Sequence, residues 1–157
     1  MNPDFENQIR DNFEKAFIDT LTKNINKDPP DIKWLSELFA EIRTKLINLT
    51  PNNKSFQAEI CSGLDLDLFK QMLVNSAFDM NDLKTLVDFV FSICLKLCAP
   101  VRDQDIYDTQ NNLQQMIVEN KSFGEIVSTF VVHANKIIDA IHEDIRIFYK
   151  GNQTPKA

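Results

Sequence analysis

The stretch LCAPVRDQD, residues 97–105, brings together the side chains of this sequence that are best suited to chemistry. Arg102 can bind a carboxylate or a phosphate through two parallel hydrogen bonds, and a nearby acid such as Asp103 or Asp105 can move a proton. These residue types support one hypothesis, an enzyme with a cleft near Arg102 and Asp103.

The same stretch also fits a corner between two helices. Pro100 biases the residue before it away from helical backbone, and Asp103 can cap the helix that follows. Arg102 lies near the carbonyl-rich end of the preceding helix, where a cation is favoured. We therefore predict no catalytic residue here. The prediction is a structural corner or partner contact in which Arg102 binds acids or carbonyls, made by Pro100, Arg102, Asp103 and Asp105.

The cysteines and histidines do not have the spacing of a metal site. Cys94 and Cys98 are one helical turn apart, but no second Cys or His pair completes the four ligands that zinc needs. Cys61 is isolated in sequence, and we interpret all three cysteines as small core residues. His133 and His142 are nine positions apart on one predicted helix, which places them on opposite sides.

The acidic pairs and the glycines exclude other common sites. Asp65 and Asp67 resemble a fragment of a calcium loop, but the sequence does not continue into the full loop pattern. The chain has 3 glycines, too few for the glycine-rich loop that binds phosphate groups. We predict no metal and no cofactor, and the sequence identifies no small-molecule substrate.

Helical periodicity dominates the chain, and no alternating strand pattern competes with it. The predicted fold is all-α, a single compact bundle of about six to seven helices with a largely buried central helix at about 80–98 and a long C-terminal helix at about 122–149. Expected caps are Asn2, Asp65, either Asp79 or Asn81, and the Ser122 box, and Gly151 is the expected stop of the last helix. We expect one domain over residues 1–150 and a frayed tail over 151–157.

The first predicted helix has an unusual apolar pattern. Apolar residues recur every four positions from Phe5 to Ile25, so the stripe turns by about 40° at each step around a helix of 3.6 residues per turn. A spiralling stripe of this kind predicts contact with more than one neighbour.

Composition narrows the classes of partner and location. The formal net charge of the 157 residues is -6, and the 17 basic residues are scattered, which argues against nucleic acid as a partner. The start of the sequence lacks a secretory signal, and no apolar run reaches the roughly 20 residues of a membrane span. With an odd number of cysteines and no CxxC, the chain is expected in the reducing cytoplasm.

Three segments resemble the T-complex protein 11 family. LCAPVRDQD is similar to the LCAPVRDE-type signature of that family, and the similarity extends over Pro29–Pro51 and Ala58–Asp103 in the same order. After Asp105 it weakens, because IYDTQNNLQQ replaces the family's basic, leucine-containing segment. Family members are usually several hundred residues long, so the chain resembles a short, N-terminal-half version of the kind that a virus could carry.

The resemblance implies an all-helical, cytoplasmic, non-enzymatic protein linked to cAMP-dependent signalling. The leading hypothesis is a helical interaction or regulatory protein that acts through a protein partner or a homodimer. The alternatives are a structural or virion-associated viral protein and the enzyme with a cleft near Arg102.

Overall fold

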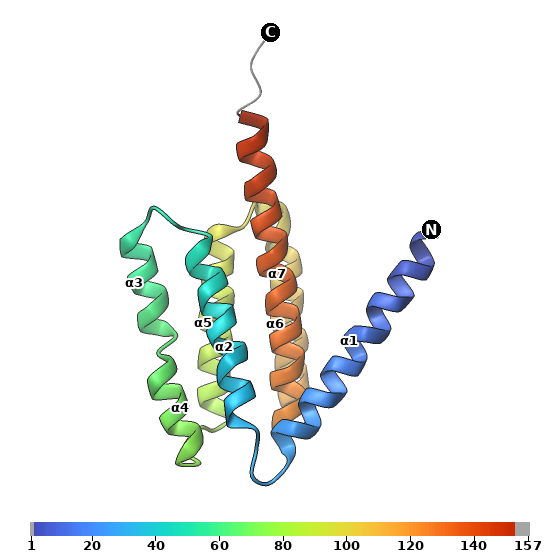
Figure 1. Ribbon diagram of the computed structural model, residues 1–157, viewed down its shortest axis with the longest axis vertical. Helices are drawn as coiled ribbons and strands as arrows, with labels where there is room; N and C mark the ends of the chain where they lie inside the picture. The colour runs from blue at the N-terminus through green and yellow to red at the C-terminus, as the bar shows by residue number, and fades with distance from the viewer. Residues whose placement is uncertain (1, 153–157) are drawn as a thin grey trace.

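The computed structural model describes residues 2–152 and is all-α, with no strand in that range. The described residues form seven α-helices and one short 3-10 turn, and Figure 1 shows how the helices are arranged. Their bounds are α1 Pro3–Asn26, α2 Ile32–Asn48, α3 Lys54–Gly63, α4 Leu66–Val74, α5 Met80–Leu97, η1 Pro100–Arg102, α6 Asp103–Val118 and α7 Phe123–Asn152. The all-α prediction and the long C-terminal helix are confirmed.

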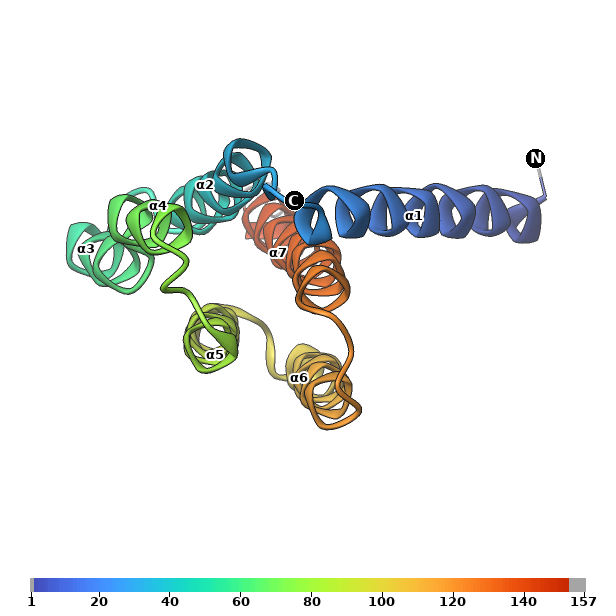
Figure 2. The same cartoon turned by 90° about the horizontal axis from the view of Figure 1, so that it is seen from below.

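Helices α2 to α7 form a compact bundle from which α1 projects as an arm (Figures 1 and 2). Viewed from below, α2, α7, α6 and α5 surround the core, and the short helices α3 and α4 flank α2. Helix α7 contacts α1, α2, α5 and α6, and α5 contacts α3, α6 and α7. These contacts and the six buried residues of α5 agree with the largely buried helix predicted at about 80–98.

Phenylalanine rings connect the helices of the bundle interior. Phe130 of α7 lies 5.8 Å from Phe39 of α2 and 5.6 Å from Phe91 of α5, measured between ring centroids. Phe39 also lies 4.7 Å from Phe69 of α4. Phe39, Phe91 and Phe130 are at most 1% exposed. Tilted and edge-on ring pairs of this kind add to the free energy of apolar burial, so these contacts set how the four helices pack.

The predicted helix starts are confirmed by their hydrogen bonds. The Asn2 and Asp65 side chains accept the N–H groups of residues two and three positions ahead, at 3.0 Å and 3.1 Å. Asp79 and Asp82 form a reciprocal capping box at 2.9 Å and 3.0 Å. Ser122 Oγ accepts the N–H of residue 125 at 3.1 Å. Each cap satisfies N–H groups that the first helical turn leaves without a partner.

The end of the last helix differs from the prediction. Helix α7 continues through Gly151 to Asn152, whereas Gly151 was expected to stop it. A glycine commonly ends a helix by taking up left-handed backbone, and the structure has no glycine with positive φ in the described range. Residues 153–157, the remainder of the expected tail, lie outside the described residues. Within residues 2–152, no helix has the length and apolar content needed to cross a membrane.

Candidate functional site

The LCAPVRDQD stretch forms a tight corner between α5 and α6. Ala99 has extended backbone, with φ -66° and ψ 146°, and Pro100 then begins the 3-10 turn η1. Asp103 was expected to cap α6, but it is the first residue of that helix, with φ -54° and ψ -44°. The reason is that the Asp103 N–H bonds to the Pro100 carbonyl, so the 3-10 turn winds directly into α6 without an extended capping residue.

Arg102 joins this corner to the last helix. Its Nε donates to Asp144 Oδ2 at 2.7 Å and its Nη2 donates to Asp144 Oδ1 at 3.0 Å, which is a bidentate ion pair. The two side chains are 36% and 30% exposed. The hydrogen bonds raise the pKa of Arg102 and lower the pKa of Asp144, so both groups are charged at neutral pH.

The remaining side chains of the corner have other partners. The Cys98 thiol donates to Asp103 Oδ1 at 3.2 Å. Asp105 is exposed and lines a small hollow of about 200 Å³ together with Arg102, Ile106, Lys136, Ile137 and Ala140. Asp103 does not line this hollow, so the structure does not bring the three polar side chains of the cleft hypothesis around one cavity.

The thiols near the corner are held in their protonated form. Burial, with a smaller contribution from the Asp103 hydrogen bond, raises the pKa of Cys98 to about 11. Burial also raises the pKa of Cys94 to about 12. A thiolate, not a thiol, is the nucleophile and the metal ligand, so both groups are unreactive at neutral pH. Cys61 is exposed.

A wide, open hollow of about 970 Å³ lies above the corner, and we call it the corner hollow. It is bounded by the α2–α3 turn, the end of α5 and the last turns of α7. Asp144 of α7 is one of its lining residues. Its other lining residues are Asn48 to Asn53, Leu97, Cys98, Ala99, Ile141, His142, Ile145, Arg146, Phe148 and Tyr149.

The two histidines do not approach each other. His133 is partly buried, and burial lowers its pKa, with a further lowering by the positive charge of Lys136. His142 is exposed at the rim of the corner hollow. Among the described residues, no group of three or more His, Cys, Asp or Glu side chains is placed to hold a metal ion.

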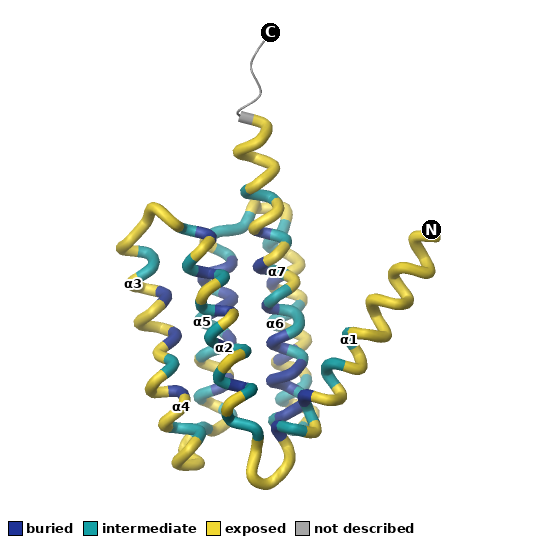
Figure 3. Tube along the Cα trace, in the orientation of Figure 1, coloured by how far each residue is buried: buried dark blue, intermediate teal, exposed yellow. Residues whose placement is uncertain are grey.

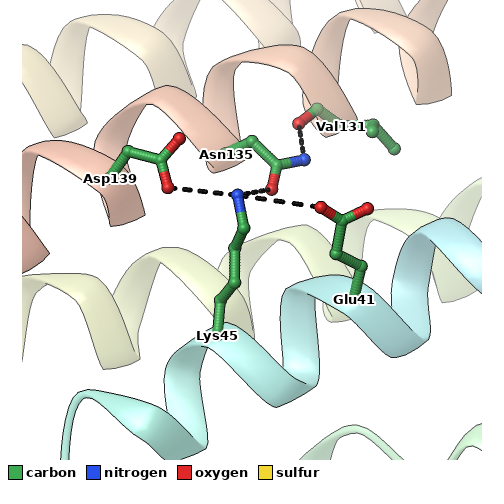
Figure 4. A network of polar contacts seen from close by, with 5 residues as sticks. All are labelled: Glu41, Lys45, Val131, Asn135 and Asp139. Carbon is green, nitrogen blue, oxygen red and sulfur yellow. Dashed lines mark hydrogen bonds and ion pairs between the residues drawn. The ribbon is translucent and has the colours of Figure 1, made fainter.

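Figure 4 shows a polar network between α2 and α7 that the sequence analysis did not identify. Lys45 Nζ lies 2.9 Å from Asn135 Oδ1, 3.1 Å from Asp139 Oδ1 and 3.8 Å from Glu41 Oε1. Asn135 in turn donates to the Val131 carbonyl at 2.9 Å. The i, i+4 spacing of Glu41 with Lys45 and of Asn135 with Asp139 was the available pattern, but nothing local indicated that the two pairs face each other.

The apolar face near the start of α1 has no partner within the described chain. Phe5, Ile9 and Phe13 are 54%, 38% and 72% exposed, and we call these three residues the arm face. Figure 3 shows that the outer part of α1 is exposed throughout and that buried positions occur only towards its end. The buried residues of α1 are Leu21 and Ile25. The stripe predicted along α1 is present, but only its second half contacts other helices.

The root of the arm is fixed on the start of α7. The Gly124 N–H donates to Asn26 Oδ1 at 2.9 Å, and Asn26 Nδ2 donates to Ser122 Oγ at 3.0 Å. Thr22 Oγ1 donates to Ser128 Oγ at 3.2 Å. A Cβ on Gly124 would lie 2.5 Å from Asn26 Oδ1 and 2.8 Å from the Thr22 carbonyl, so the close approach of the helices requires glycine here.

An ion pair marks where the arm leaves the bundle. Glu14 of α1 contacts Lys136 of α7 at 2.5 Å, and Phe17 packs edge-on against Trp34 of α2 at 6.0 Å between ring centroids. Residues 3–13 lie beyond these contacts and are exposed. The arm is therefore anchored over its C-terminal half and projects over the first three helical turns.

These features define an all-α helical bundle with a projecting N-terminal helix and an ion-paired corner. The chain belongs to the T-complex protein 11 family, because the sequence model of that family matches residues 1–148. The match includes α1, which the resemblance quoted above did not cover.

Curated relatives agree with this assignment. The chain is 32% identical over 107 residues to a human T-complex protein 11 homolog, covering 68% of this chain and 21% of that protein. It is 30% identical over 102 residues to human T-complex protein 11-like X-linked protein 1, covering 64% and 20%. It is 27% identical over 107 residues to mouse T-complex protein 11, covering 66% and 18%.

The chain therefore spans about a fifth of the length of the curated relatives that it matches. No solved structure matches it.

Proposed function

We propose that this protein is a non-enzymatic interaction module whose arm face binds another protein chain. The observation that carries the proposal is the exposure of Phe5, Ile9 and Phe13 on a helix that is firmly anchored at its other end. Exposed apolar residues that lie together on one face, rather than singly, mark contact surfaces. Large aromatic side chains contribute strongly to the binding free energy of such surfaces.

The rigidity of the arm root supports this function. The hydrogen bonds of Asn26 and Thr22 and the Glu14–Lys136 ion pair hold α1 at a defined angle to α7. A binding helix that is already folded and oriented loses less conformational entropy on association than a flexible tail.

The contacts of the corner favour this proposal over an enzyme. Arg102 is engaged by Asp144, and Asp103 accepts a hydrogen bond from Cys98. The Cys94 and Cys98 thiols are also held protonated. The side chains of the corner that could take part in catalysis are therefore either unreactive or engaged in contacts within the protein.

Site-specific photo-crosslinking tests the proposal. A photoreactive amino acid replaces Phe13 in one variant and Asn7, on the opposite side of the same helix, in a control variant. We expect the position 13 variant to form one covalent adduct, either with a second copy or with a defined protein identified by mass spectrometry. Equal labelling from the two positions, or none, would contradict a binding role for the arm face.

We further propose that this contact acts in cAMP-linked signalling in the cytoplasm, which membership of the family supports. Phosphorylation of a reporter of cAMP-dependent kinase, measured in cells that express the chain or its Phe13→Asp variant, tests the idea. The idea is contradicted if the reporter response is the same in cells that express the wild-type chain, in cells that express the variant and in cells that express neither. Enrichment of the chain in purified virus particles would instead favour the structural, virion-associated alternative.

A further inference from the structure

The arm face cannot be covered by the bundle to which α1 belongs. Ile25 is 5% exposed and points into the core at the arm root. Each four-residue step along the stripe turns by about 40°, so Ile9, four steps earlier, points about 160° away from Ile25. Bending α1 back onto its own bundle would bring the opposite, polar side of the arm into contact. The bundle itself therefore does not supply the occupant of the arm face.

The arrangement of apolar residues on the arm is self-complementary. The order Phe5, Ile9, Phe13 is the same read in either direction, with the smaller side chain in the middle. If a second arm lies antiparallel with its Ile9 against the Ile9 of the first, each Phe5 meets the Phe13 of the other copy. A two-fold axis through the Ile9 positions then relates the two copies, as an isologous interface requires.

The charges beside the stripe fit the same antiparallel pairing. At about 100° per residue, Glu6 and Arg10 follow one edge of the arm face, whereas the acids Asp4 and Asp11 lie on the opposite side. In an antiparallel pair, Glu6 of each copy comes beside Arg10 of the other, so two opposite-charge contacts form. The edge carries one acid and one base, and the acidic chain with its net charge of -6 therefore presents a locally neutral surface here.

The two bundles do not obstruct this pairing. The contact that attaches the arm to its bundle begins at Glu14, and the N-terminus lies away from the bundle (Figures 1 and 2). In an antiparallel pair centred on Ile9, residue 14 of one copy lies near residue 4 of the other. The bundles are then at opposite ends of the paired arms.

We propose that the partner of the arm face is a second copy of this chain, bound by antiparallel pairing of the α1 arms about Ile9. This inference rests on the proposed function of the arm face and names its partner. Three apolar side chains per copy cover less than the roughly 800 Å² per partner of a standard stable interface. The dimer is accordingly reversible, with a dissociation constant in the range of about 10–100 µM.

Sedimentation equilibrium of the whole chain over a roughly hundredfold concentration range measures this association. We expect a monomer–dimer equilibrium that Phe13→Asp weakens by at least about tenfold, because each dimer then buries two carboxylates. Circular dichroism and thermal unfolding should be unchanged, since Phe13 is 72% exposed. A chain that stays monomeric throughout the range, or a dimer that Phe13→Asp leaves intact, overturns the inference.

Charge exchange tests the antiparallel register. Glu6→Arg or Arg10→Glu alone should weaken the dimer, and the double variant should restore it, because the two residues then exchange signs in both contacts. A double variant that is weaker than both single variants overturns the register.

Symmetric disulfide formation tests the two-fold axis. In a Cys61→Ser background, Ile9→Cys should form covalent dimers under mild oxidation, and Asn7→Cys on the opposite side should do so at least about tenfold more slowly. Equal rates overturn the inference. If the chain is monomeric and position 13 instead crosslinks to a different, defined protein, the dimer is wrong while the proposed binding function stands. If position 13 crosslinks to nothing, both are wrong.

Discussion

The Arg102–Asp144 ion pair offers a direct test of the corner as a stabilising contact. In Arg102→Ala, the bidentate contact between the α5–α6 corner and α7 is lost. Exposed ion pairs contribute about 0.2–1 kcal/mol, and solvent screens this pair because its side chains are 36% and 30% exposed. The two parallel hydrogen bonds place the contribution of this pair at the upper end of that range. We therefore expect Arg102→Ala to lower the free energy of unfolding by about 1 kcal/mol, which lowers Tm by about 2–4 °C in a chain of this size.

A double-mutant cycle isolates the contribution of the pair. Urea unfolding of the wild type, Arg102→Ala, Asp144→Asn and the double variant should give a coupling free energy of about 1 kcal/mol. Arg146→Ala is the matched control, because Arg146 pairs with Glu143 one turn away on the same helix and joins no two elements. We expect that control to leave the free energy of unfolding unchanged within experimental error.

The pH dependence provides an independent check. Arg102 holds the pKa of Asp144 below its usual range, so the stabilisation is complete above the unfolded pKa of about 3.9 and is lost as the pH falls through the lowered folded value. The difference between wild type and Arg102→Ala should be constant from about pH 5 to pH 8 and shrink below about pH 4. The reasoning is refuted if Arg102→Ala costs no more than the Arg146→Ala control, or if lost cellular activity accompanies unchanged stability.

Three further changes test other parts of the molecule. Gly124→Ala should cost about 1–3 kcal/mol in urea unfolding, because its Cβ would overlap the arm root, whereas Gly151→Ala, with no atom within 4 Å, should cost nothing measurable. In thiol titration at neutral pH, exposed Cys61 should react at once and Cys94, with a pKa of about 12, only on unfolding; simultaneous reaction would contradict the burial argument. Lys45→Met should lower the free energy of unfolding by up to about 1 kcal/mol, and an unchanged value would show that the α2–α7 network adds no stability.

The bundle was predictable from sequence because its determinants are local. A cap such as Asp79 lies within three residues of the N–H that it satisfies, and helix α5 shows its buried face in the spacing of its own apolar residues. Such patterns can be recognised in the sequence without knowing which helices pack against each other. The expected cap at Asp103 was wrong because residue type alone does not fix the backbone there. The 3-10 turn, which is set by hydrogen bonding, gives Asp103 helical backbone.

Exposure along α1 could not be read from the same pattern. Phe13 and Phe17 occupy equivalent places in the four-residue repeat, yet Phe13 is 72% exposed and Phe17 packs against Trp34. The difference arises from the crossing of α1 over α7, which depends on the close contact at Gly124. That contact joins residues about 100 positions apart, and no local rule specifies it.

The corner shows how far residue chemistry alone can be taken. The chemistry of a guanidinium indicates that Arg102 needs an acid or carbonyls, and the sequence supplies two acids at once, Asp103 and Asp105. The structure instead places Arg102 on Asp144, 42 residues away, because the 3-10 turn aims it at α7 while Asp103 turns toward Cys98. Neighbouring acids along a chain are therefore weak evidence for a shared site. An arginine beside a helix break has access to every helix that meets at that corner, and the packing of those helices selects its partner.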